Sequence, residues 1–394
     1  MDKILDIHNY KRQFERQVEL IKDNSKISKT NKKIAIDFKD YLLSEGISVA
    51  KIGRYLLDVR KFALMLNKSF DKADEKDLRK VVASIEQSEL APESKKCFKV
   101  MIRKLYRFIR GINERGKYPK EVEWISIAIP KNHKKLPEEL LTEEEIKRLI
   151  QNCENLRDKA LFSCIAESGA RISEIALMQI KHVSFEEYGA RLTIKGKTGT
   201  RKVLVISSMP YLQQWINDHP YNENPDSYLW YSQKNQLLSY SRISFILKKA
   251  SKKAGINKRV YLHLLRHSRA TLMASIMSES AMKQYFGWGQ DSKMAAIYVH
   301  MSGKDTDEAI LRANGIEVST KKRESSLKPI ICLKCKTKNE VTNRFCKICG
   351  MILNEEEAQK ILKVDIERQQ ADEIMNKLIK DPEIFELMKR KLSD

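Results

Sequence analysis

Hydrophobic residues recur every three or four positions over most of the chain, which is the spacing of an amphipathic α-helix. This spacing predicts a helix over residues 1–25, four helices between residues 30 and 111, and eight between residues 142 and 300. In residues 191–206, by contrast, two apolar runs flank a glycine-containing turn and predict two antiparallel strands. The predicted fold class is mainly α with a small antiparallel β-sheet.

Breaks in this pattern divide the chain into six segments. Thr142 and Glu145 form a capping-box pattern, so a helix and a new domain are expected to begin there. The preceding stretch is rich in Gly, Pro and Lys and is expected to be a linker. The predicted segments are a helical arm (1–29), a helical domain (30–111), a linker (112–141), a mixed α and β domain (142–316, with a helix over 301–316), a linker and four-cysteine ribbon (317–353), and a helical tail (354–394).

The net charge of the chain indicates which class of molecule it binds. The chain carries a formal net charge of +22, and because residues 355–394 contribute −3, residues 1–354 carry +25. A positive body of this kind points to an anionic polymer or surface. We see neither a secretory signal nor an apolar run of the roughly 18 residues that a membrane span needs. A cytoplasmic protein without a membrane partner is therefore expected.

The last helix predicted in residues 30–111 has two different faces. One face is apolar, and the other carries five basic residues at spacings of three and four with no acid between them: Lys96, Lys99, Arg103, Arg107 and Arg110. Like charges along one stripe repel each other unless an anion lies beside them, so DNA contact is one interpretation of this basic stripe. A solvated face is the other.

The richest candidate chemistry lies in residues 261–300. This stretch holds a His-x-x-Arg motif at His263 and Arg266, a Gly-Trp pair ending at Trp288, and Tyr298. A phosphodiester is an anion, so a nucleophile reaches it only when fixed cations neutralise its non-bridging oxygens, and arginine suits this task best. Tyrosine can be the covalent nucleophile, because nearby cations favour its phenolate. Each residue alone is more often an ordinary packed side chain, but the set fits phosphoryl transfer.

This chemistry needs a second arginine and a proton donor from elsewhere in the chain. Arg171 follows a turn-like Ser-Gly-Ala break, and Glu174 stands one helical turn later, where it could orient the guanidinium. Lys197, near the tip of the predicted hairpin, is the candidate that protonates the departing oxygen. Lys195 is its rival.

The boxes A-R-I-S-E-I, G-K-T-G, H-L-L-R-H, F-G-W-G and Y-V-H-M-S, in this order, resemble the tyrosine recombinases of the phage-integrase family. The resemblance covers roughly residues 30–316 and favours Lys197 over Lys195. It implies a core-binding domain that contacts DNA over 30–111 and a catalytic domain over 142–316. His267 is expected to be structural. The implied catalytic set is Arg171, Lys197, His263, Arg266, Trp288 and Tyr298.

The resemblance implies site-specific recombination of double-stranded DNA through a 3′-phosphotyrosyl intermediate, by four protomers on two duplexes. Neither ATP nor a catalytic metal is expected, because the covalent bond conserves the phosphoryl energy. Two alternatives stay open at this point. One is a nicking and closing enzyme like a type IB topoisomerase, and the other is a non-catalytic DNA-binding zinc-ribbon protein.

Four of the seven cysteines form two Cys-x-x-Cys pairs ten residues apart: Cys332, Cys335, Cys346 and Cys349. This spacing is typical of a tetrahedral zinc site, with a redox pair or free thiols as the alternative. A ribbon this short cannot form a core without metal, so structural zinc is expected. The segment resembles the short zinc ribbons appended to archaeal proteins, including integrase-like ones, which favours an archaeal type of recombinase.

Overall fold

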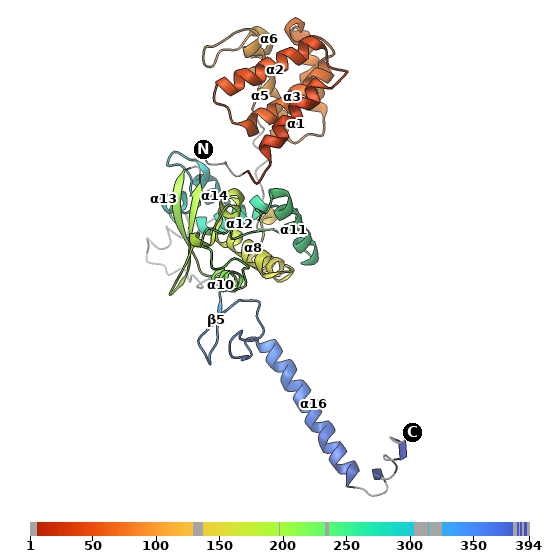
Figure 1. Ribbon diagram of the computed structural model, residues 1–394, viewed down its shortest axis with the longest axis vertical. Coiled ribbons are helices and arrows are strands. Elements are labelled where there is room, and N and C mark those ends of the chain that lie inside the picture. Colours follow the sequence, from red (N-terminus) through yellow and green to blue (C-terminus); the bar gives the residue numbers. More distant parts are fainter. Residues whose placement is uncertain are drawn as a thin grey trace. The chain divides into compact units, whose positions relative to one another are not determined.

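The chain forms two compact units, Met1–Lys135 and Leu136–Asp394 (Figure 1). The computed structural model describes residues 6–128, 137–196, 198–232, 236–302, 314 and 325–380, with 384, 385, 387, 390 and 391. Both units are mainly helical, and the second adds a small antiparallel sheet, which confirms the predicted fold class. Among the described residues, no helix is both long enough and apolar enough to cross a membrane.

The first unit packs its helices around one apolar core. The four helices predicted between residues 30 and 111 are present close to their expected bounds, and the arm helix begins at Tyr10. Residues 1–5 of the predicted arm lie outside the described residues. The helices are α1 (Tyr10–Lys22), α2 (Lys29–Ser44), α3 (Val49–Leu66), α4 (Glu75–Gln87), α5 (Pro92–Ile109) and α6 (Lys120–Glu123).

The core of this unit extends into the stretch predicted as a linker. Val122 and Ile125 are fully buried, and Tyr118 and Trp124 pack beside them. Only Val122 of these lies within α6, whose four residues are too few to produce a periodic pattern. Residues 129–136 of the predicted linker lie outside the described part of the chain.

The second unit packs helices against a small sheet (Figure 1). Each of the eight predicted helices is present, although the third ends at Ala176, earlier than expected. The capping box at Thr142 is formed, because its hydroxyl and the Glu145 carboxylate each accept from the other's backbone N–H. The helices are α7 (Glu143–Gln151), α8 (Leu156–Ser168), α9 (Ile172–Ala176), α10 (Met209–Asn217), α11 (Tyr240–Lys253), α12 (Leu262–Ala274), α13 (Glu279–Phe286) and α14 (Met294–Ser302).

The sheet contains the predicted hairpin and one further strand. Its strands β1 (Val183–Glu186), β2 (Gly189–Gly196) and β3 (Gly199–Val205) are antiparallel in the order β1-β2-β3. β1 was not expected, because its apolar alternation spans only four residues, which are mostly exposed. On β3, Arg201 lies on the inward face with Val203 and Val205, and it pairs with Ile194 of β2.

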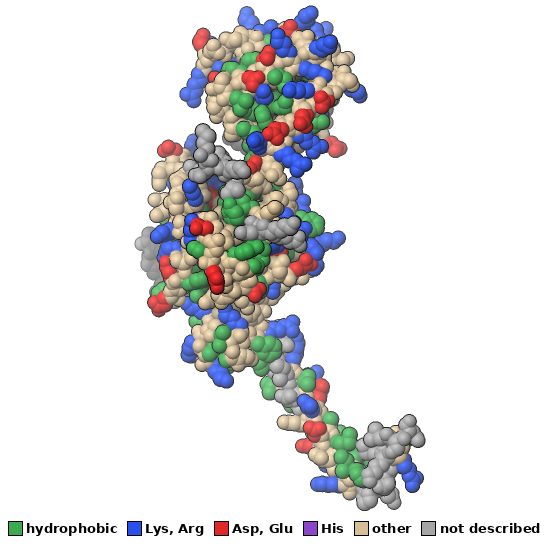
Figure 2. All heavy atoms as spheres, in the orientation of Figure 1, with side chains coloured by type: hydrophobic (Ala, Val, Ile, Leu, Met, Phe, Trp, Pro, Cys, Tyr) green, Lys and Arg blue, Asp and Glu red, His purple; other side chains and the backbone are tan. Residues whose placement is uncertain are grey.

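The four-cysteine ribbon contains β4 (Ile330–Ile331) and β5 (Lys338–Asn339) and is followed by α16 (Glu355–Ile379). The ribbon packs on the helical part of its unit, because the Tyr211 hydroxyl of α10 lies 3.1 Å from the Thr342 hydroxyl. Apolar side chains such as Leu362 and Ile374 are exposed along α16 (Figure 2). The helix expected over 301–316 and the linker after it fall largely outside the described residues.

Candidate active site

Two arginines meet at the turn that follows α13. Arg266 donates from Nη1 to the Gly169 carbonyl (2.7 Å) and from Nη2 to the Phe286 carbonyl (2.9 Å). Arg171 donates from Nη1 to the Gly287 carbonyl (3.3 Å). Phe286 and Gly287 are neighbours in the chain, so the two guanidinium groups are brought together as the predicted catalytic set requires.

Two glycines allow this approach. Gly169 ends α8 and Gly287 ends α13, with φ values of 57° and 62° that non-glycine residues rarely adopt. A Cβ on Gly169 would lie 2.4 Å from the Phe286 ring, and a Cβ on Gly287 would lie 2.6 Å from the Arg201 guanidinium. A larger residue at either position would therefore displace the segment that holds the arginines.

One buried carboxylate, that of Glu174, orients these cations. Its Oε1 accepts from Arg171 Nη1 (2.9 Å), and its Oε2 accepts from the Arg171 backbone N–H (2.9 Å) and from Arg201 Nη2 (2.7 Å). The predicted contact between Glu174 and Arg171 is thus present. Burial alone would raise the pKa of Glu174, but the hydrogen bond and charge of Arg201, with the contacts from Arg171, hold this pKa below its ordinary value.

Arg201 is a part of the site that the sequence motifs did not single out. Besides its ion pair with Glu174, its Nε donates to the Tyr285 carbonyl (3.0 Å). A signal for it exists, because the alternation along β3 places Arg201 on the same face as Val203 and Val205. An arginine on a buried face requires an acidic or polar partner nearby.

The arginine cluster, formed by Arg171, Arg201 and Arg266, carries more positive charge than its surroundings neutralise. Glu174 pairs with two of the three, and within the described chain Arg266 has no carboxylate at ion-pair distance. Burial lowers the pKa of Arg266 to about 10, and the charge of Arg171 adds to this shift, so the group is still protonated at neutral pH. A surplus of fixed cations in a largely buried site favours an anion such as phosphate.

Tyr298 lies in an aromatic stack beside this cluster. Its ring stacks on Trp288 with 5.5 Å between centroids and 1° between planes, and Trp288 stacks on Phe286 at 4.9 Å. The Arg266 guanidinium lies 5.5 Å from the Trp288 ring centroid. Tyr298 is only 2% exposed, and this burial raises the pKa of its phenol, while the charge of Arg266 acts in the opposite direction.

The two histidines of α12 relate differently to the phenol. His263 is exposed, and its ring meets the His267 ring edge-on with 4.6 Å between centroids. Nδ1 of His267 lies 2.5 Å from the Tyr298 hydroxyl. His267, which was expected to be structural, therefore contacts the oxygen of the candidate nucleophile.

The hairpin reaches the same turn. The Thr198 hydroxyl donates to the Gly287 carbonyl (3.2 Å), and a Cβ on Gly196 would lie 2.5 Å from the Glu174 carboxylate. Lys197, the predicted proton donor between these two residues, lies outside the described residues. Its rival Lys195 is exposed on β2.

The basic stripe on α5 is largely paired inside the first unit. Lys99 forms an ion pair with Glu86 (2.8 Å), and Arg110 forms one with Glu121 (2.8 Å). These acids come from α4 and α6, so the stripe's own sequence could not reveal them. Their charge relieves the repulsion on which the prediction of DNA contact rested.

The other arginines of the stripe also have partners. Arg103 lies over the Tyr118 ring, 3.6 Å from its centroid, and donates to the Ile125 carbonyl. Arg107 donates to the backbone carbonyls of residues 112–114. DNA contact through the stripe therefore stays a prediction. Among the described residues of the stripe, Lys96 is the one most available for such a contact.

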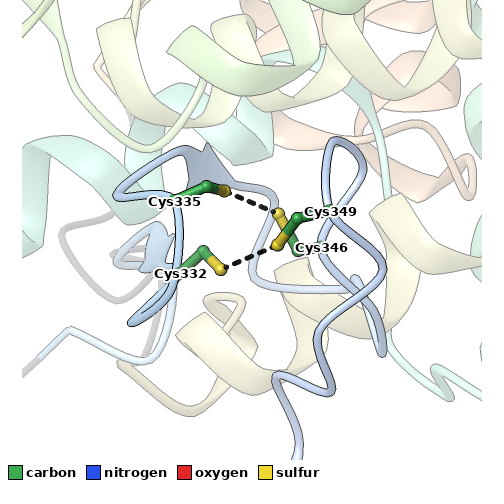
Figure 3. Close-up of side chains that lie close together, drawn as sticks. All are labelled: Cys332, Cys335, Cys346 and Cys349. Carbon is green, nitrogen blue, oxygen red and sulfur yellow. Dashed lines mark hydrogen bonds between the residues drawn. The ribbon is translucent and has the colours of Figure 1, made fainter.

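The four ribbon cysteines come together as predicted (Figure 3). The Cys332 and Cys349 sulfurs are 3.5 Å apart, as are those of Cys335 and Cys346, and all four lie within 4.8 Å of one another. A tetrahedral zinc ion with bonds of about 2.3 Å would place its sulfurs about 3.8 Å apart. The cluster therefore has the ligand type and the dimensions of a metal site.

Comparison with known proteins identifies relatives for most of this chain. Residues 139–304 match the phage integrase family. The chain is 28% identical over 285 residues to a tyrosine recombinase of Thermosipho africanus, covering 69% of this chain and 96% of that protein. It is 28% identical over 291 residues to tyrosine recombinase XerA of Pyrococcus furiosus, covering 71% and 94%. The similarity to XerA is consistent with the predicted archaeal type.

Solved structures show the same fold at lower identity. The XerH site-specific recombinase, bound to its palindromic difH substrate, aligns with a TM-score of 0.54 and 20% identity over 80% of this chain and 98% of that one. A lambda integrase dimer bound to a COC′ core site aligns with a TM-score of 0.57 and 17% identity over 73% and 82%. Together with the motif residues gathered near one turn, the sequence matches identify a phage integrase domain over residues 139–304, in a chain that is similar over most of its length to tyrosine recombinases.

Proposed function

We propose that this protein is a site-specific recombinase that cuts and rejoins double-stranded DNA through a covalent bond to Tyr298. The observation that carries the proposal is the surplus charge of the arginine cluster, placed beside a phenol that lies close to Arg266. A phosphodiester supplies the anion that this cluster lacks, and the phenol supplies the nucleophile.

In the proposed reaction, Arg171 and Arg266 hold the non-bridging oxygens of the scissile phosphate. The Tyr298 oxygen attacks phosphorus, the bond from phosphorus to the 5′-oxygen breaks, and a 3′-phosphotyrosyl bond forms. Trp288 and His263 complete the phosphate pocket by packing and hydrogen bonding, and Lys197 protonates the leaving 5′-oxygen as a general acid. Rejoining is the reverse step with the 5′-hydroxyl of another strand. Neither ATP nor a catalytic metal is required, because the covalent bond conserves the phosphoryl energy.

The burial of Tyr298 indicates that the site is in an inactive arrangement that precedes DNA binding. Tyr298 is 2% exposed between Trp288 and His267, so a phosphate cannot reach its oxygen from solvent in this arrangement. We infer that DNA binding separates Trp288 from the Tyr298 ring before attack, while the Tyr298 hydroxyl keeps its contact with His267.

The assembly is proposed by analogy. XerH has been solved bound to a difH substrate, and lambda integrase as a tetramer bound to a Holliday junction. We propose that this chain also binds a specific double-stranded DNA site and exchanges strands as a homo-tetramer. The expected cytoplasmic, DNA-associated location follows from that substrate.

A covalent adduct on a denaturing gel tests the activity. Labelled fragments of DNA from the protein's own source are incubated with wild-type protein and with Tyr298→Phe, in the presence of a chelator and without ATP. The expected result is an adduct at one mapped position with the wild type, and DNA binding without an adduct for the variant. Adducts spread over all sequences would indicate a topoisomerase-like enzyme, and binding without any adduct would indicate a non-catalytic DNA-binding protein.

We propose further that Cys332, Cys335, Cys346 and Cys349 hold one structural zinc ion. Metal analysis is expected to find one zinc per wild-type chain and none in the double variant Cys332→Ser/Cys335→Ser. Cys97→Ser is the matched control, because Cys97 is an exposed thiol in the other unit and its loss should leave the zinc content unchanged. Equal zinc in the double variant and the wild type would contradict the assignment.

A further inference from the structure

The imidazole of His267 touches the reacting atom, yet the proposed reaction gives it no role. Its Nδ1 lies 2.5 Å from the Tyr298 hydroxyl oxygen, and the two ring centroids are 5.8 Å apart. Both side chains project from helices of the same unit, α12 and α14, which pack against each other. This contact is therefore a feature of the packed site and involves the oxygen that must bond to phosphorus.

A buried phenol needs a proton acceptor within the protein. The hydroxyl proton has to leave when the oxygen bonds to phosphorus, and solvent has little access because Tyr298 is 2% exposed. Arg171 and Arg266 are protonated donors and cannot accept a proton. Glu174 is a poor acceptor, because Arg171 and Arg201 hold its pKa below the ordinary value.

The position of His267 meets this need. A neutral imidazole with its proton on Nε2 presents a lone pair at Nδ1, the atom that faces the phenol. Imidazole exchanges protons near neutral pH, which a general base for this step requires. His263 stands one helical turn earlier on α12, where its exposed ring meets His267 edge-on and can approach a phosphate.

We propose that His267 is a catalytic residue that takes the hydroxyl proton of Tyr298 as its oxygen attacks the phosphate. The Oη–H bond breaks and an Nδ1–H bond forms, while the P–Oη bond forms and the P–O5′ bond breaks. The leaving 5′-oxygen takes its proton from a separate donor. In the rejoining step, the imidazolium returns the proton to Oη as the phosphotyrosyl bond breaks. The inference rests on the proposed function, because it assigns a base to the same reaction.

Two substitutions separate proton transfer from positioning. In His267→Asn the amide oxygen can occupy the place of Nδ1 and accept the phenol hydrogen bond, but it cannot take the proton. His267→Ala removes both functions. The probe is the DNA fragment on which the wild-type cleavage position has been mapped, with the leaving 5′-oxygen replaced by sulfur. A thiolate departs without a proton, so the contribution of Lys197 is absent from the measured rate.

The expected result is that His267→Asn forms the adduct about 100-fold or more slowly, the lower range of a general base's contribution. The wild-type rate should rise as the pH increases through the imidazole range, near pH 6.5, and this rise should vanish in both variants. Among the described residues, the His267 ring contacts those of His263 and Tyr298, so the profile is also recorded for His263→Gln, in which the rise should persist. A wild-type rate and an unchanged pH profile in His267→Asn would overturn the proposal.

A measurement on the free protein tests the hydrogen bond without any reaction. With ¹⁵N-labelled histidine, the wild type should show Nδ1 of His267 unprotonated at neutral pH, and Tyr298→Phe should shift that resonance. A proton on Nδ1 would mean that the imidazole donates to the phenol, and this would overturn the proposal. Failure of the wild type to form any adduct would instead overturn the recombinase activity itself, so the two failures are distinguishable.

Discussion

The arginine cluster of the second unit and the basic stripe of the first unit both place several cations close together, but they balance their charge differently. In the cluster, Glu174 forms ion pairs with Arg171 and Arg201, and Arg266 has no carboxylate at ion-pair distance within the described chain. On the stripe, Lys99 and Arg110 each have an acid of their own, and Arg103 has an aromatic face. Figure 2 shows acidic side chains among the basic ones over the first unit, on the face in view.

The difference shows that spacing of basic residues is a weak guide to anion binding. The stripe is regular in sequence, yet the fold supplies most of its counter-charges from α4 and α6. The cluster is scattered over the chain, yet the fold concentrates it around too few acids. A net surplus of charge in the folded protein, rather than a run of like charges in the sequence, is what calls for an external anion.

The largest contrast is expected in stability when one cation of each set is removed. Arg201→Ala leaves Glu174 buried with one partner fewer, and breaking a buried pair in this way typically costs about 3–5 kcal/mol. Arg110→Ala breaks a half-exposed pair, for which about 1 kcal/mol or less is expected. Denaturant unfolding followed by circular dichroism measures both. Equal losses for the two variants would show that the cluster is no more tightly coupled than the stripe.

Adduct formation should distinguish the two sets next. Arg171→Ala removes a donor to the phosphate and should slow the reaction by about 10²–10³-fold, the usual effect of losing one such donor. Arg103→Ala, the matched change on α5, should leave the rate on saturating DNA near that of the wild type. Single-turnover rates on the mapped fragment provide the comparison. An Arg103→Ala rate as low as that of Arg171→Ala would contradict the separation of roles.

Salt dependence of DNA binding should reveal which cations of the stripe remain available. Each phosphate contact contributes about 0.9 to the slope of log affinity against log salt. Lys96→Ala should lower the slope by about that amount if Lys96 contacts DNA, whereas Arg110→Ala should leave it unchanged because Glu121 already pairs with Arg110. A lower slope for Arg110→Ala alone would show that the stripe exchanges its partners on binding.

The smallest effect concerns pH. The folded-state pKa of Glu174 lies below the ordinary value of 4.5, so its ionisation contributes stability above pH 4.5 that is lost as the pH falls through the lower folded value. Glu174→Gln should therefore reduce the fall in unfolding free energy between about pH 5 and pH 3. Glu86→Gln is the control on α4. If the unfolding free energy falls equally at acid pH in Glu174→Gln and the wild type, the ionisation of Glu174 does not contribute to that fall.

The elements of the fold were largely readable from the sequence, because amphipathic periodicity and capping signals act locally. The hairpin, the helices and the capping box at Thr142 were all predicted. Strand β1 and the helix around Val122 were not, because each spans only four residues, too few for a periodic run to stand out. Val122 is buried by the core of the first unit, whereas β1 stays mostly exposed and is fixed by its pairing with β2.

The candidate site was predictable where a motif names the residue and less so where packing decides the role. Arg171, Arg266 and Tyr298 stand in recognisable boxes, and the fold brings them to one turn. The roles of Arg201 and His267 depend on the contact of Arg201 with Glu174 and that of His267 with the phenol. No motif encodes either contact. The partners of Lys99 and Arg110 on the stripe could not be read from its own sequence for the same reason, since they come from other helices.

The central claim is that the surplus charge of the arginine cluster serves a covalent reaction at Tyr298. Peptide mapping of the trapped adduct by mass spectrometry tests it most directly, after nuclease digestion of the bound DNA. A nucleotide 3′-phosphate is expected on the peptide that contains Tyr298 and on no other. The same modification on a different tyrosine, or an adduct that forms equally well in Tyr298→Phe, would contradict it.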